Sequence, residues 1–183
     1  MHNLLTYRFT LTNLVAMSVC AVLWTQGIIQ PLFAQDTTYI SHSIVVLFAI
    51  ASIATWRQAL RLSGQINCFK SEPAGAIGED KEKALAKLTW LKDISGWLTG
   101  LGLLGTVVGF AVALNGVNQG TLGSASGVQS NVAQLVAGMR IAVNTTIIGA
   151  ALGLWHELNV RMLWTAADCY WTDRISTLKR QEA

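Results

Sequence analysis

The chain has 183 residues, of which 52% are hydrophobic and only 13% are charged, and its mean hydropathy is +0.43. A soluble domain carries about 25% charged residues, so this composition predicts an integral membrane protein. The net charge of +3 is too small to favour nucleic-acid binding. The sequence also lacks the ten-residue segments of alternating apolar and polar residues that are typical of a β-barrel. The three cysteines show no CxxC spacing, so free thiols are expected.

The first apolar run is predicted to be a retained transmembrane helix. Residues 11–34 carry no charged side chain and exceed the roughly 20 residues that cross a hydrocarbon core. A cleaved signal peptide is the alternative. Its apolar region would span only about 7–15 residues, and the sequence near Ala34 is a poor cleavage site, so the retained span is favoured.

A second span is predicted over residues 37–56, after Pro31 and Asp36 interrupt the first run. His42 lies near its start. Because imidazole titrates near neutral pH, a proton relay is one interpretation of this residue, but its place near the interface favours a solvated histidine.

Positive charge is concentrated between the second and third spans and after the fourth. The basic residues in these two places are Arg57, Arg61, Lys70, Lys81, Lys83, Lys87, Lys92, Arg161, Arg174, Lys179 and Arg180. Loops rich in lysine and arginine stay in the cytoplasm, which predicts cytoplasmic termini and a cytoplasmic segment 57–93. Within that segment, residues 71–75 form a break, and residues 79–92 form an amphipathic helix that runs into the third span.

The third and fourth spans each carry a face of small residues at helical spacing. On the third span, residues 94–117, these are Gly102, Gly105, Gly109, Ala113 and Gly116. On the fourth, which begins near Val132, they are Gly138, Ala142, Thr145, Gly149 and Gly153. Each interior glycine costs about 1 kcal/mol relative to alanine, so these faces predict close helix packing in a membrane.

A Gly/Ser-rich turn over residues 118–127 joins these two spans, and no glycine or proline interrupts the chain after Glu157. The predicted fold is therefore an all-α integral membrane protein with four transmembrane helices, the last two long and extended into the cytoplasm. We divide the chain into an N-terminal transmembrane hairpin, a short basic cytoplasmic segment, a transmembrane pair and a C-terminal cytoplasmic helix. Their bounds are 1–56, 57–93, 94–158 and 159–183.

The sequence contains no pattern for soluble-type catalysis. A Ser-His-Asp arrangement, paired carboxylates in a plausible pocket, a metal-ligand cluster and a phosphate-binding loop are all missing, so no catalytic residue, metal or cofactor is expected. The membrane part offers hydroxyls and one amide instead: Thr106, Asn144, Thr145 and Thr146. Hydrogen bonds within or between helices are the plain interpretation of these groups, and a polar path is the functional one.

The two small-residue spans resemble the MotA/TolQ/ExbB proton-channel family. The motif LGLLGTVVGF covers residues 101–110, followed by Gly138-Met139 and by NTTIIG over residues 144–149. The resemblance implies a homopentamer around two single-span partners of MotB/TolR/ExbD type, with an aspartate on the partner helix carrying the proton. It implies that Thr106 and Thr146 line the path. It also implies a rotary motor of the bacterial inner membrane that converts ion motive force into mechanical work.

The residues of this chain agree with a proton-carrying aspartate on the partner. Between Ile94 and Leu154 there is no Asp, Glu, His or Lys, so a titratable group must come from another chain. Three positions depart from the family pattern: Thr99 and Trp155 stand where many members have proline, and Ile141 where some have glutamate. The choice between H⁺ and Na⁺ stays open at this point, and a non-conducting membrane scaffold or assembly factor is the alternative function.

Arg140 is the single charge within the last two spans. It lies about 12 Å along the fourth span by helical rise, where an unpaired charge is costly. Snorkelling to the interface is one interpretation. Contact with a neighbouring subunit or an acidic partner, together with Asn144 one turn away, is the other.

Overall fold

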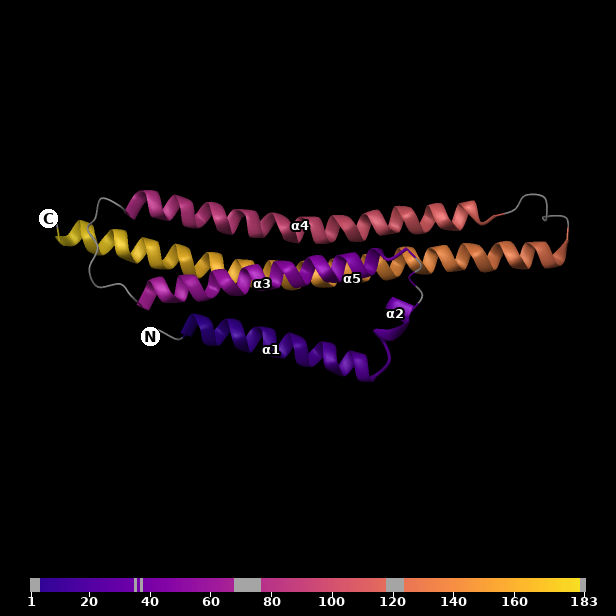
Figure 1. Ribbon diagram of the computed structural model, residues 1–183, viewed down its shortest axis with the longest axis horizontal. Helices are drawn as coiled ribbons and strands as arrows, with labels where there is room; N and C mark the ends of the chain where they lie inside the picture. The colour runs from indigo at the N-terminus through magenta and orange to yellow at the C-terminus, as the bar shows by residue number, and fades with distance from the viewer. Residues whose placement is uncertain (1–3, 35, 37, 68–76, 118–123, 182–183) are drawn as a thin grey trace. The chain divides into compact units, whose positions relative to one another are not determined.

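The computed structural model describes residues 4–34, 36, 38–67, 77–117 and 124–181. Its helices in chain order are α1 (Leu4–Thr25), α2 (Gln30–Ala34), α3 (Ile40–Asn67), α4 (Ile77–Asn115) and α5 (Ala125–Gln181), as Figure 1 shows. No strand occurs among the described residues, which confirms the all-helical prediction.

Four of these helices are long and apolar enough to cross a membrane, as the sequence predicts. Within the described residues the candidate spans are Thr6–Thr25, Ile40–Gly64, Leu88–Asn115 and Ala125–Asp173. The chain is thus a multi-pass membrane protein by the length and composition of its helices.

The first span is shorter than predicted, because α1 ends at Thr25 rather than continuing to Ala34. Gly27 adopts a left-handed backbone with φ of 74°. Its N–H donates to the Trp24 carbonyl over 3.0 Å, and the Ile28 N–H donates to the Leu23 carbonyl over 3.1 Å. This pair of bonds is a Schellman motif, which closes a helix where glycine adopts a positive φ. The apolar run therefore continues as a separate short helix, α2.

Asp36 fixes the start of α3. Its carboxylate accepts hydrogen bonds from the Thr38 backbone N–H at 2.9 Å, the Thr38 hydroxyl at 2.6 Å and the Ser41 backbone N–H at 2.8 Å. The first N–H groups of a helix have no partner in the helix itself, so this carboxylate supplies one from outside. At its other end α3 runs to Asn67, well past the predicted end of the span at residue 56.

The last two helices are continuous rods. The predicted amphipathic segment 79–92 and the third span form one helix, α4, as expected. The fourth span begins at Ala125 and not near Val132, because the Ser124 hydroxyl accepts a bond from the Gly127 N–H at 3.2 Å and caps the helix. The remainder of the predicted turn, residues 118–123, and the predicted break at residues 71–75 lie outside the described residues.

The length of α5 is nearly three times the thickness of the hydrocarbon core. Its 57 residues extend about 86 Å at a rise of 1.5 Å per residue, against a hydrocarbon core of about 30 Å. This confirms that the helix continues beyond Glu157 as an uninterrupted rod.

The contacts group the chain into two compact units. Unit 1 contains residues 1–20, 49–95 and 154–183, and unit 2 contains residues 21–48 and 96–153. Helices α1, α3, α4 and α5 each contribute to both units.

Unit 1 has an apolar core with polar contacts across its helices. Leu163 and Val160 of α5 are 0% and 2% exposed. The amides of Asn13 on α1 and Asn159 on α5 bond each other at 2.9 and 3.2 Å, and the Trp155 indole N–H donates to Asn13 at 3.1 Å. These bonds join α1 to α5 in a segment where unpaired polar groups would be costly.

Candidate functional site

The two small-residue faces meet in unit 2. A Cβ added to Gly102 would lie 3.1 Å from the Gly149 Cα, and one added to Gly109 would lie 2.6 Å from the Ala142 N. Further along, a Cβ on Gly138 would meet Ala113. Because the α5 residue number falls as the α4 number rises, the two helices pack antiparallel.

Gly109 and Gly138 are required at these contacts because a Cβ does not fit there without displacement of the neighbouring helix, and the contact at Gly102 is tight. Separations below 3.0 Å are not sustained by real Cβ atoms, and two of the three atoms met at Gly109 belong to the backbone of α5. In a membrane, where lipid tails are as apolar as leucine, such close approach is the main source of helix association. Gly149 and Gly153, two further residues of the predicted packing face, are buried on α5.

Close packing brings two hydroxyl groups together. Thr106 Oγ1 on α4 and Thr146 Oγ1 on α5 are hydrogen-bonded to each other. Each hydroxyl also lies near a carbonyl of its own helix, Thr106 at 3.2 Å from Gly102 O and Thr146 at 2.9 Å from Ala142 O. Both threonines are half-buried, so the pair lies at the edge of the helix contact.

The other two predicted path residues occupy different surroundings. Thr145 is 0% exposed and lies directly against Gly105, and its hydroxyl donates to the Ile141 and Ala142 carbonyls at 3.0 Å. Asn144 is 8% exposed. It shares the buried α5 face of Ile141 and Ile148, since residues three and four apart align on a helix. The structure thus brings together only two of the four predicted path residues.

Arg140 lies on an exposed face of α5, one turn before Asn144. The sequence from Ile94 to Leu154 contains no other charged residue, so the parts of α4 and α5 that carry the threonine pair are uncharged apart from this guanidinium. A guanidinium cannot release its proton near neutral pH.

The chemistry of the pair follows from its hydroxyl groups. A hydroxyl donates one hydrogen bond and accepts two, so it can receive a proton on one lone pair while passing its own to a neighbour. Thr106 can donate either to Gly102 O or to Thr146, which leaves room for such rearrangement. Neither hydroxyl can store a proton near neutral pH, so the chemistry of the pair suits relaying a proton or lining a polar path and does not suit storing a proton.

The polar contacts of unit 1 are not predicted by the sequence pattern. The Ser95 hydroxyl lies 2.7 Å from Glu157 Oε2, and His156 Nε2 lies 3.1 Å from the Leu91 carbonyl. His156 is 0% exposed. The available signal was the group of polar residues at the end of an apolar run, but the partner of each side chain lies on a helix distant in sequence. No group of three His, Cys, Asp or Glu side chains that could hold a metal occurs among the described residues.

Comparison with known proteins identifies one family. A model of the MotA/TolQ/ExbB proton channel family matches residues 58–163, more than half of the chain. The match contains both small-residue faces and the threonine pair. No curated protein and no solved structure gives a significant match to this sequence.

Proposed function

The chain belongs to the MotA/TolQ/ExbB proton channel family, and on that premise we propose that it is the proton-conducting subunit of a rotary motor in the bacterial inner membrane. Five copies surround single-span partners of MotB/TolR/ExbD type. A membrane aspartate of the partner carries the proton, and its passage turns one component against the other to deliver mechanical work.

The threonine pair is the observation that supports this proposal most directly. Thr106 and Thr146 bond each other at a glycine-packed interface, in a stretch that has no side chain able to exchange protons near neutral pH. An external carboxylate then has a defined role. Water and the two hydroxyls deliver a proton to it, and the low dielectric favours its neutral form, which can move past an apolar wall.

The exposed surface of α4 supports a ring. Leu103, Val107 and Leu114 are 60%, 70% and 68% exposed in the single chain. Apolar side chains of this size are covered by lipid or by other subunits in a membrane protein. Neighbouring copies and the partner helix would cover part of this surface, with lipid covering the rest.

The distribution of charge supports the orientation. Lysine and arginine are concentrated in segment 57–93, which contains the end of α3 and the start of α4, and near the end of α5. We therefore place this segment and both termini in the cytoplasm, so that the distal part of α5 projects inward.

The test is proton flux through the co-expressed complex in liposomes. Thr106→Val and Thr146→Val each remove a hydroxyl and keep the shape of the side chain. Loss of one hydrogen-bonded hydroxyl costs about 1–3 kcal/mol, which corresponds to a flux lower by about tenfold to a hundredfold. Size-exclusion chromatography should show an intact oligomer in both variants.

The matched control is Thr165→Val on the same helix. Thr165 is exposed, and its hydroxyl donates only to the Arg161 carbonyl one turn back, at 3.0 Å. Its flux should equal that of the unaltered protein. Unchanged flux in both pore variants would contradict the pore assignment and favour the alternative, a non-conducting scaffold with the same helix packing.

A further inference from the structure

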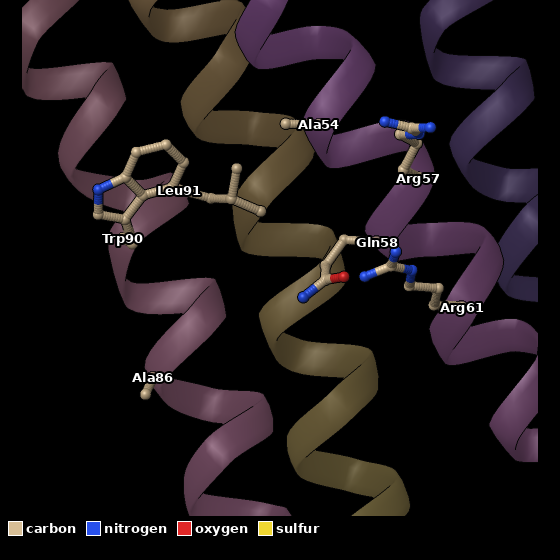
Figure 2. A pocket seen from close by; sticks show the side chains of 7 residues that line it. All are labelled: Ala54, Arg57, Gln58, Arg61, Ala86, Trp90 and Leu91. Carbon is tan, nitrogen blue, oxygen red and sulfur yellow. The ribbon is translucent and has the colours of Figure 1, made fainter.

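A pocket of unit 1 lies outside the candidate ion path. It has a volume of about 510 Å³ and is formed by α3 and α4. Its α3 side includes Arg57, Gln58 and Arg61, and its α4 side includes Ala86, Trp90 and Leu91 (Figure 2). This volume lies within the range of about 300–1,000 Å³ that is typical of small-molecule sites.

One wall of the pocket is cationic. Arg57 and Arg61 lie one turn apart on α3, and both side chains are exposed. Figure 2 shows the Arg61 guanidinium directed towards the Gln58 amide. Two guanidinium groups and an amide therefore offer hydrogen-bond donors to an anion.

The opposite wall is apolar and includes a tryptophan, a residue type that is common at membrane–water interfaces. Leu91 is buried, and Trp90 is 57% exposed beside it. Tryptophan is enriched at the level of lipid headgroups, where its ring meets both apolar and polar surroundings. The pocket therefore combines donors for an anion with a surface suited to hydrocarbon.

The position of the two arginines along α3 agrees with a location at the level of the lipid headgroups. They follow the start of α3 at Ile40 by about 26 and 32 Å of helical rise. A hydrocarbon core is about 30 Å thick. If α3 crosses the bilayer from Ile40, its arginines arrive where the phosphates of the second leaflet begin.

We propose that this pocket binds the headgroup phosphate of an anionic phospholipid. The guanidinium groups of Arg57 and Arg61 hold the phosphate, since their planar donors match its oxygens. The indole of Trp90 and the side chain of Leu91 contact the glycerol and the upper acyl chain. Basic pockets between transmembrane helices are known to accept anionic headgroups on the cytoplasmic side. This binding is independent of ion conduction.

The experiment measures thermal unfolding of the full chain in a neutral detergent, with dioctanoyl phosphatidylglycerol, dioctanoyl phosphatidylcholine or inorganic phosphate added. Phosphatidylglycerol at about 100 times its Kd should raise the midpoint by about 5 °C or more. The other two additives should raise it much less. Arg57→Gln with Arg61→Gln should abolish the phosphatidylglycerol effect.

Two further variants make the result specific. Arg8→Gln with Arg161→Gln removes the same charge from exposed positions outside the pocket and should keep the effect. Ala86→Trp fills the pocket while keeping both arginines, and it should abolish the effect.

Three results would overturn the proposal. The first is equal stabilisation by phosphatidylcholine, or by inorganic phosphate, which would mean that no anionic lipid is selected. The second is full stabilisation in the Arg57/Arg61 double variant. The third is loss of the oligomer in that variant with the lipid effect retained, which would assign the arginines to a neighbouring copy.

Discussion

A hydroxyl can pass a proton on but cannot hold one near neutral pH, and this limits what Thr106 and Thr146 can do. Their mutual hydrogen bond defines a polar point at the α4–α5 interface. Thr145, which directly precedes Thr146, faces Gly105, and its hydroxyl donates to a carbonyl of its own helix. Two consecutive threonines therefore differ in surroundings: Thr145 packs against α4, and Thr146 is a candidate path residue.

At the same scale, the negative charge of Asp36 stabilises the start of α3. Burial alone would raise the pKa of this carboxyl, but the hydrogen bonds from Ser41 and Thr38 outweigh burial and hold the pKa below its ordinary value. The ionised form is thus bound more tightly in the folded protein than in the unfolded chain. Stability from this group is fully present above the unfolded pKa of about 3.9 and is lost as the pH falls through the lower folded pKa.

We expect Asp36→Asn to lower the unfolding free energy by about 1 kcal/mol at pH 7, because the start of α3 loses a charged acceptor. Melting temperatures between pH 7 and pH 3 check this. The gap between the variant and the unaltered protein should close below about pH 4. Asp93→Asn, at an exposed position of α4, is the control and should show little effect at pH 7. A gap that stays constant down to pH 3 would contradict this role for Asp36.

At the scale of the helices, glycine acts only where two backbones meet. On α4, Gly109 lies against the Ala142 backbone, whereas Gly100 has nothing within 4 Å of the position of a Cβ. The same substitution at these two sites should therefore have opposite effects.

Gly109→Ala should destabilise the α4–α5 pair by about 1–3 kcal/mol, because a methyl group would displace the neighbouring backbone. Gly100→Ala should be neutral or stabilising by up to about 1 kcal/mol, since alanine favours the helix. Unfolding in a titration with denaturing detergent measures both changes. Equal loss of stability at the two positions would mean that the glycines do not act through close packing.

The sequence predicts the helices better than it predicts their ends. Periodic glycines place the α4–α5 contact, and the uncharged runs place four spans. The end of α1 depends on a Schellman motif at Gly27, inside an uncharged apolar run. The start of α5 depends on the Ser124 cap, inside a Gly/Ser-rich turn whose composition does not select one residue as the first of the helix.

The candidate site was predicted only in part, because periodicity describes one helix at a time. It placed Thr106 and Thr146 on their helices, and the family motif paired them. Periodicity also placed Thr145 on the small-residue face, about 100° of helical rotation from Thr146, but Thr145 was predicted as a path residue as well. The Asn13–Asn159 pair was missed because its two residues lie 146 positions apart.

At the scale of the whole molecule, an exposed charge of the single chain is a candidate contact between subunits. Arg140 is exposed on the same helix as the threonine pair. We propose that its guanidinium contacts a neighbouring subunit or an acidic group of the partner, whereas the burial of Asn144 at 8% exposure does not fit the predicted joint contact.

Arg140→Ala should preserve membrane insertion but weaken assembly, because a charge at this depth is retained only where it is compensated. Light scattering after size-exclusion chromatography should show a smaller oligomeric fraction than in the unaltered protein. Arg161→Ala, an exposed arginine further along α5, should leave that fraction unchanged. If both variants assemble fully, Arg140 is not an assembly contact.

The central claim is that this chain forms the wall of the proton path while another chain supplies the acid. Proton uptake into liposomes under an imposed membrane potential tests it most directly. The purified chain alone should conduct no more than empty liposomes, and co-reconstitution with a single-span partner that carries a membrane aspartate should open the path. Proton flux through the chain without any partner would contradict the account.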